Sequence, residues 1–198
     1  MGSDFSVRLQ TGDALIAVDV QNDFLPGGSL AVPDGDAVVP VINRYLAEFA
    51  ARALPVYATR DWHPPNHCSF KAQGGIWPPH CVAATHGAEF ARSLALPATA
   101  AVISKAATPE IDAYSGFGGT DLAARLRAGR VTRLFIGGLA TDYCVLNTVR
   151  DALAGGFEVL LLADAIRAVD ANAGDGGRAL DEMRQRGARV IRCEDLAP

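Results

Sequence analysis

The sequence has no run of apolar residues that approaches the ~18 needed for a membrane-spanning helix. The segment from Met1 to Thr11 also lacks the basic stretch followed by an apolar one that marks a signal peptide. Both absences argue against a membrane as a partner. We therefore expect a cytoplasmic location.

Basic residues are not in excess either. The chain has 18 Lys and Arg against 22 Asp and Glu, which gives a net charge of −4. Proteins that bind nucleic acid need clustered positive charge to neutralise the phosphates, so this balance argues against a nucleic-acid partner.

Cysteine is scarce, and four cysteines in 198 residues do not suggest a disulfide framework. There is no internal repeat and no low-complexity segment. The share of hydrophobic residues, 49%, is that of a globular protein with one sizeable core. We expect a single domain over residues 1–198.

Short apolar runs alternate with amphipathic segments along the chain, and this alternation is typical of a parallel α/β fold. The predicted strands are 13–20, 55–59, 100–104, 131–136, 156–163 and 188–192. One predicted helix begins near Asp36, and the others span 119–129, 143–154 and 174–187. The sequence thus predicts a three-layer, Rossmann-like α/β fold, with an open, mostly parallel six-stranded sheet and helices on both faces.

Four of the predicted strands lead into a reactive side chain: Asp19, Asp61, Lys105 and Cys144. Ligands of such folds bind beyond the carboxyl ends of the strands, so the fold would bring these four side chains to one edge. A carboxylate, an ammonium and a thiol together supply a nucleophile with a base and a charge partner. The alternatives are that Asp19 is a helix cap or a salt-bridge partner, and that Lys105 is a solvated strand end.

Cys144 falls in the first turn of the helix predicted at 143–154, with Thr141 or Asp142 as its N-cap. At that position the free backbone N–H groups and the helix dipole favour the thiolate over the thiol, and the same amides could bind an oxyanion. The alternative is that Cys144 is a small core residue, as most free cysteines are.

The longest irregular stretch, from Asp61 to about Thr85, contains candidate metal ligands. Asp61 and His63 project to the same side of an extended segment, and His80 could close the far side of the loop. Two imidazoles and one carboxylate suit Zn²⁺, Fe²⁺ or Mn²⁺ and leave coordination positions open. One alternative is a closed zinc site that uses Cys68 and Cys81. Another is that the histidines only form hydrogen bonds.

Six motifs resemble those of the nicotinamidase/pyrazinamidase family, within the isochorismatase-like cysteine hydrolases, and they occur in the family's order. They are VDVQNDF (18–24), TRDWHPPNHCSF (59–70), WPPHC (77–81), ISKA (103–106), AYSGF (113–117) and GLATDYCV (138–145). The first and last motifs indicate only the superfamily. The DWHPPNH and WPPHC motifs are specific to the nicotinamidase branch, because its relatives lack this metal loop.

The resemblance implies a role for each matching residue. It implies a catalytic triad of Asp19, Lys105 and Cys144, a metal site of Asp61, His63 and His80, and aromatic packing of the substrate ring by Phe24 and Trp77. It also implies a cis peptide bond between Leu139 and Ala140, which turns the amides of Ala140 and Cys144 into an oxyanion hole. His67 stays open as a fourth ligand: some members with a longer loop use a histidine there, whereas members with this shorter loop do not.

The function that the resemblance implies is hydrolysis of nicotinamide to nicotinate and ammonia in NAD salvage, through a cysteine thioester, with pyrazinamide as a second substrate. The metal would be a single divalent ion, zinc first, with iron and manganese as alternatives. The protein would be a monomer or a small homo-oligomer. Two other readings stay open: a related cysteine amidohydrolase acting on another small amide, and a metal-loop protein without enzymatic activity.

Overall fold

The computed structural model describes residues 6–197, so the predicted domain of residues 1–198 extends at both ends beyond the described residues. Six strands form one sheet in the order β3-β2-β1-β4-β5-β6. They are β1 (Asp13–Val18), β2 (Val56–Asp61), β3 (Ala101–Lys105), β4 (Arg133–Leu139), β5 (Glu158–Arg167) and β6 (Arg189–Ile191). Every neighbouring pair is parallel. The predicted parallel sheet is confirmed.

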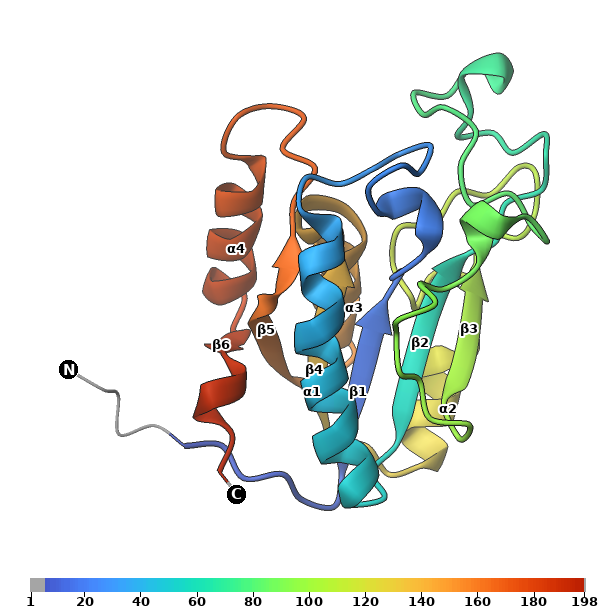
Figure 1. Ribbon diagram of the computed structural model, residues 1–198. Helices are drawn as coiled ribbons and strands as arrows, with labels where there is room; N and C mark the ends of the chain where they lie inside the picture. Colours follow the sequence, from blue (N-terminus) through green and yellow to red (C-terminus); the bar gives the residue numbers. More distant parts are fainter. Residues whose placement is uncertain (1–5, 198) are drawn as a thin grey trace.

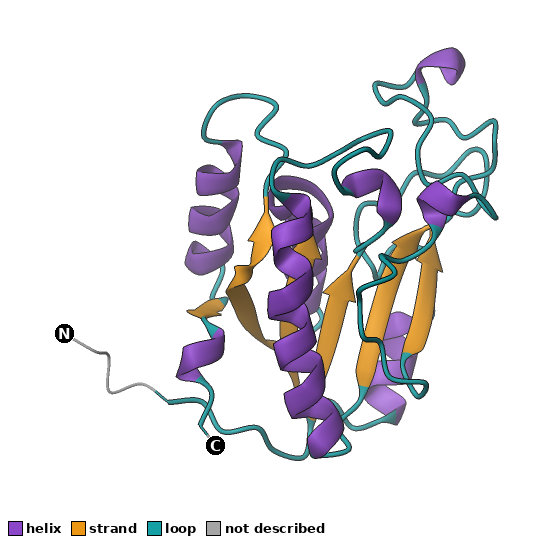
Figure 2. Ribbon diagram, in the orientation of Figure 1, coloured by secondary structure: helices purple, strands orange, loops and turns teal. Residues whose placement is uncertain are grey.

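Helices cover both faces of this sheet, as Figures 1 and 2 show. They are α1 (Val38–Ala51), α2 (Leu122–Ala128), α3 (Leu146–Ala154) and α4 (Asp175–Gln185). The buried side chains of α1 belong to one core, and those of α2, α3 and α4 belong to the core on the opposite face. The predicted three-layer arrangement is therefore confirmed as well.

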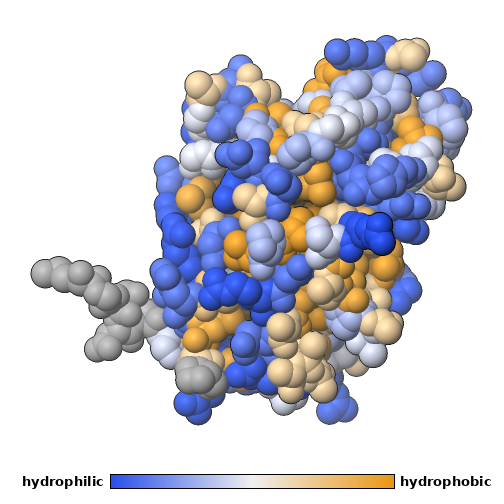
Figure 3. All heavy atoms as spheres, viewed as in Figure 1, coloured by the Kyte–Doolittle hydropathy of each residue, from blue (hydrophilic) through white to orange (hydrophobic). Residues whose placement is uncertain are grey.

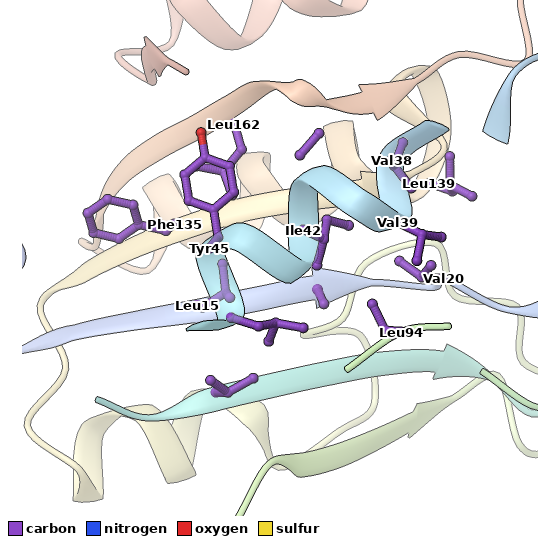
Figure 4. Packing of buried hydrophobic residues seen from close by; sticks show 14 of the residues in the cluster. Leu15, Val20, Val38, Val39, Ile42, Tyr45, Leu94, Phe135, Leu139 and Leu162 are labelled. Carbon is purple, nitrogen blue, oxygen red and sulfur yellow. The ribbon is translucent and has the colours of Figure 1, made fainter. Parts of the chain in front are cut away.

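The apolar runs of the sequence form strands because both faces of the sheet are covered. Along β1, Leu15 and Ala17 face the α1 core, while Ile16 faces the opposite core. Figure 4 shows the Tyr45 side chain of α1 directed toward Leu162 on β5. The buried Tyr45 hydroxyl donates a hydrogen bond to Asp164 Oδ1 at 3.0 Å, so its polar atom is satisfied within the core.

On the face that Figure 3 displays, hydrophilic and hydrophobic residues are intermixed. Within residues 6–197, the exposed large hydrophobic residues are Ile76, Val102 and Ile111. Over the same range, none of the helices has the length and apolar character required to cross a membrane.

Several element ends differ from the predicted ones, and these differences shape the carboxyl edge of the sheet. β1 ends at Val18 rather than at residue 20, because Asp19 takes a left-handed conformation with φ 48°. β2 and β3 run on to include Asp61 and Lys105 themselves. β4 continues through Gly137 and Gly138 to Leu139, beyond the predicted end at residue 136, and its pairing with β5 shifts register there.

Gly138 permits this extension of β4 because no other residue fits its position. Its φ is 130°, a value that L-residues rarely adopt, and a Cβ added there would overlap the Val18 carbonyl oxygen of the neighbouring strand. The close approach of β4 to β1 at this point determines where the chain leaves the sheet toward Cys144.

Gly138→Ala should lower the free energy of unfolding by roughly 3 kcal/mol or more, because the overlap adds to the cost of the positive φ. Gly156→Ala is the matched control: it has φ 85° with no atom within 4 Å of an added Cβ. This control should cost about 1 kcal/mol. Thermal melts check the difference, at about 2–4 °C per kcal/mol for a chain of this size. Equal shifts for the two variants would contradict the close approach.

Candidate active site

A small pocket opens at the carboxyl edge of the sheet, beneath the long segment between β2 and β3 that rises above the strand ends in Figure 1. Its volume is about 40 Å³, which limits it to a small molecule. The lining residues are Phe24, Leu30, Val32, Asp61, His63, Ser69, Trp77, His80, Asp112, Ala113, Tyr114, Ala140, Tyr143, Cys144 and Val169. Seven of these are residues that the sequence singled out, and Asp19 and Lys105 lie directly behind them.

The Lys105 ammonium is the centre of this edge. It is 1% exposed, so the alternative of a solvated strand end is wrong. Nζ lies 3.0 Å from Asp19 Oδ2 and forms a second, very short ion pair with Asp61 Oδ1. It also donates to the Ala113 carbonyl at 3.1 Å and to Cys144 Sγ at 3.4 Å. Burial alone would lower the pKa of Lys105, but the two carboxylates outweigh it and hold this pKa well above its usual value.

The Asp19 carboxylate is fully buried and only partly satisfied. Oδ1 accepts a hydrogen bond from Thr59 Oγ1 at 2.6 Å. No well-aligned hydrogen bond from the described residues reaches Oδ2, although Lys105 lies beside it. Burial, together with the charge of Asp61, raises the pKa of Asp19 despite the opposing effects of Lys105 and Thr59. Oδ2 can therefore accept a proton, and Asp19 is a buried ion-pair partner of Lys105 and not a helix cap.

Cys144 lies at the start of α3, although not in the predicted geometry. Residues Thr141–Val145 form a π-helical turn with Ala140 at the N-cap, and no side chain caps it. Neither Thr141 nor Asp142 is the cap, so that prediction is wrong. The Asp142 carboxylate instead accepts the backbone N–H groups of Val169 and Asp170, both at 2.9 Å. Because its carboxylate accepts these two hydrogen bonds, Asp142 does not cap the helix.

The predicted preference of Cys144 for the thiolate is also wrong. Burial raises the pKa of the Cys144 thiol well above its usual value, and the charges of Asp19 and Asp61 add to this effect while Lys105 opposes it. One carboxylate oxygen of Asp19, one of Asp61 and Cys144 Sγ lie within 4.8 Å of one another. The thiol thus rests protonated beside a carboxylate that can take its proton.

Asp61, His63 and His80 converge on one point, with a ligand atom of each within 4.8 Å of the others. His63 Nδ1 lies 3.2 Å from the Ala106 carbonyl and His80 Nδ1 lies 2.8 Å from the Pro78 carbonyl. A carbonyl only accepts, so each Nδ1 is the donor of its contact and each Nε2 is the ring nitrogen left for a metal ion. Burial lowers the pKa of His80, which keeps its ring neutral.

Asp61 completes this donor set as an ionised carboxylate. Burial would raise the pKa of Asp61, but Lys105 and His63 outweigh it and hold the pKa below its usual range. His63 Nε2 lies 3.7 Å from Asp61 Oδ2, a separation that an ion could bridge. Two imidazoles and one carboxylate fit a divalent metal ion with open coordination positions.

The structure also bears on Cys68, Cys81 and His67, the other candidate ligands of this loop. Among residues 6–197, neither of the two groups with metal-ligand spacing includes Cys68 or Cys81, so the closed zinc site has no support. His67 is a hydrogen-bonding histidine. Its Nδ1 lies 2.7 Å from Ser69 Oγ and its Nε2 lies 3.1 Å from the Ile111 carbonyl, which leaves no ring nitrogen for a metal.

Aromatic side chains form the walls of the pocket. Phe24 and Trp77 both line it, as the resemblance implied, and sequence reasoning missed two further members, Tyr114 and Tyr143. Trp77 Nε1 donates to the Tyr114 hydroxyl at 3.0 Å, and its ring meets that of Tyr143 edge-on at 5.1 Å. Both tyrosines stand inside motifs that carry the family resemblance, AYSGF and GLATDYCV, which was the available signal.

The peptide bond between Leu139 and Ala140 is cis, as the resemblance implied. Ala140 and Cys144 both line the pocket, on either side of the π-helical turn. The backbone of this turn therefore borders the space in front of Cys144 Sγ.

Comparisons with known proteins agree with this geometry. A family model described as the isochorismatase domain matches residues 13–195. The nicotinamidase of Escherichia coli K12 is 40% identical, over 92% of this chain and 95% of its own length. The crystal structure of the pyrazinamidase of Pyrococcus horikoshii in complex with zinc is 51% identical, with a TM-score of 0.88 over 91% of this chain and 99% of that one. The structure of PnC1 from L. infantum in complex with nicotinate is 38% identical, with a TM-score of 0.90 over 97% of this chain and 98% of that one.

His80→Ala should purify without metal, because it removes one of three convergent ligand atoms. His67→Gln should retain metal at the wild-type stoichiometry, because both ring nitrogens of His67 are bonded within the protein. Elemental analysis of the purified variants measures both. A metal-free His67→Gln that melts at the wild-type temperature would make His67 a fourth ligand.

Proposed function

The chain belongs to the isochorismatase family, and from this membership together with its pocket we infer that it is a nicotinamidase. It hydrolyses the amide C–N bond of nicotinamide, giving nicotinate and ammonia, and it acts on pyrazinamide as well. The observation that carries this function is the placement of Cys144, Lys105 and Asp19 directly beside the Asp61, His63 and His80 cluster.

We propose that the reaction begins with transfer of the Cys144 proton to Asp19 Oδ2, the buried carboxylate oxygen that faces Lys105 at 3.0 Å and accepts no well-aligned hydrogen bond from residues 6–197. The ammonium of Lys105, 3.4 Å from Sγ, stabilises the thiolate that remains. The thiolate then attacks the carboxamide carbon and forms a C–S bond. The negative charge that develops on the amide oxygen is bound by the backbone N–H groups of Ala140 and Cys144.

Asp19 next returns its proton to the amide nitrogen. The C–N bond breaks, ammonia leaves, and a thioester to Cys144 remains. In the second half of the cycle, Asp19 takes a proton from a water molecule whose oxygen attacks the thioester carbon. The C–S bond breaks, nicotinate leaves, and Cys144 regains its proton from Asp19. A base with a raised pKa suits this exchange, because it must gain and lose a proton twice in each turnover.

Asp61, His63 and His80 would hold one divalent metal ion, zinc first, with iron and manganese as alternatives. When bound there, the ion would supply a Lewis acid and a ligand position for the ring nitrogen of the substrate. The zinc in the P. horikoshii structure supports this choice. The rings of Phe24 and Trp77 enclose the pyridine ring of the substrate.

The charge of the pocket suits a neutral substrate. Among residues 6–197, no Lys or Arg lines it. The Lys105 ammonium, which contacts Cys144 of the lining, is already paired with two carboxylates. A neutral amide can be desolvated in such a pocket at low cost. A cytoplasmic location, a monomeric or small homo-oligomeric state, and a single domain over residues 1–198 stay predictions from the sequence.

Cys144→Ala should abolish ammonia release from nicotinamide while it preserves the fold, because alanine fits the π-helical turn. Cys193→Ala is the control: that side chain is half-buried near the C-terminus, outside the pocket lining, so its loss should leave turnover unchanged. A coupled ammonia assay and thermal melts measure the pair. More than a few per cent of residual turnover in Cys144→Ala would exclude the thioester mechanism.

Benzamide tests the substrate assignment, because it has the amide and ring size of nicotinamide without the ring nitrogen. Sites built around one polar contact reject an analogue that lacks it by about 10⁴ or more, and by less where water can substitute. We therefore expect benzamide to lose roughly 10²–10⁴ in kcat/KM, mainly through misplacement of the carboxamide. Pyrazinamide should remain a substrate. Hydrolysis of benzamide within a few-fold of nicotinamide would reduce the assignment to an unspecified small-amide hydrolase.

A further inference from the structure

The loop that follows β1 touches the metal-binding segment at a point outside the pocket. In this loop, the short 3-10 turn Asn22–Phe24 carries a half-buried carboxylate, Asp23. Asp23 Oδ2 accepts the backbone N–H of Cys81 at 2.7 Å, and Oδ1 accepts the backbone N–H of Ser29 at 3.1 Å. Asp23 does not line the pocket. Its two oxygens therefore connect the β1 loop to the residue next to His80.

The backbone of Cys81 is linked to both candidate histidine ligands, His63 and His80. It follows His80 directly in the chain, and its carbonyl accepts the backbone N–H of His63 at 3.0 Å. Its φ is 46°, a left-handed conformation that non-glycine residues adopt only when their surroundings hold them in it. The hydrogen bond from the Cys81 N–H to Asp23 is such a restraint, and a charged acceptor makes it stronger than a neutral one would.

Gly87 shows that the Asp23 carboxylate occupies a fitted position. A Cβ added at Gly87 would overlap the carboxylate, so the glycine lets the segment 86–88 pack directly over it. Asn22 also binds this segment, since its Nδ2 donates a hydrogen bond to the His86 carbonyl at 2.8 Å. The carboxylate thus contacts the backbone of the segment 86–88 as well as that of Cys81.

We propose that Asp23 is a positioning residue for the metal site, which sets metal affinity by holding the Cys81 backbone and, through it, the imidazole of His80. This rests on the proposed function, since the ligand set of Asp61, His63 and His80 is part of that proposal. Asp23 itself contributes no ligand atom. Its effect on the metal passes through the orientation of His80, which the Pro78 carbonyl restrains from the other side.

The test is a zinc titration of metal-stripped protein in competition with a chromophoric chelator. Asp23→Ala should weaken zinc binding by about 10–100-fold, the range typical of lost outer-shell partners. Asn22→Ala is the matched control, because Asn22 anchors the same loop but bonds to His86 instead of to Cys81. Its zinc affinity should stay within twofold of wild type. His80→Ala provides the reference for loss of a ligand.

The possible outcomes distinguish a failure of this inference from a failure of the proposed function. If Asp23→Ala binds zinc within twofold of wild type while His80→Ala does not bind it, Asp23 has no positioning role and the ligand set stands. If His80→Ala binds zinc as wild type does, the ligand set itself is wrong. If Asn22→Ala weakens zinc as much as Asp23→Ala, the effect is a general loosening of the loop and the inference fails.

Asp23→Asn keeps the test decisive if the alanine variant does not fold. An asparagine has one acceptor oxygen and no charge, so it can serve Cys81 or Ser29 but not both. Its zinc affinity should fall between those of wild type and Asp23→Ala, at about 3–30-fold below wild type. Wild-type affinity in a folded Asp23→Asn variant would overturn the proposal.

Discussion

The carboxyl edge of this sheet depends on one buried ammonium, that of Lys105. It stands between the carboxylates of Asp19 and Asp61 and touches the thiol of Cys144. Burying any one of these charges alone would cost several kcal/mol, and together they are tolerated because each is paired. Asp61 and Lys105 are register partners in neighbouring strands, so the pairing of β2 with β3 brings them together. The same ammonium thereby connects the proposed nucleophile to the proposed metal ligands.

The two carboxylates that share Lys105 are held in different states. Asp19 is buried, and its pKa is raised by that burial and by the charge of Asp61, so it sits closer to the point of gaining a proton. Asp61 also faces His63, and with Lys105 this lowers its pKa and keeps it ionised. Two carboxylates whose environments push their pKa values apart can take different roles. Asp19 suits a base that exchanges protons, and Asp61 suits a permanent metal ligand.

Much of the fold and of the site could be predicted, because the signals are local. The apolar runs of β1 and β4 mark buried strands, and the rule that parallel strands present their carboxyl ends at one edge placed Asp19, Asp61, Lys105 and Cys144 together. The motif resemblance supplied Phe24, Trp77 and the cis peptide at Ala140. By contrast, the end of β4 was missed because glycines rarely extend a strand. Here Gly138 is required by the close approach of Val18, a residue 120 positions away.

The sequence by itself determined the element types, the parallel sheet, and the residue types that reach its carboxyl edge, since these follow from periodicity and chain order. Only the folded structure decided which ring nitrogen of His63 and of His80 is left for a metal ion. The Ala106 carbonyl contacts Nδ1 of His63, and the Pro78 carbonyl contacts Nδ1 of His80. The folded structure also decided that both ring nitrogens of His67 form hydrogen bonds within the protein. Asp142 likewise accepts a hydrogen bond from the segment after β5 instead of capping α3. The resting protonation of Cys144 belongs to the same group. A helix terminus favours the thiolate locally, but burial beside two carboxylates favours the thiol, and that environment exists only once segments far apart in the chain have packed together.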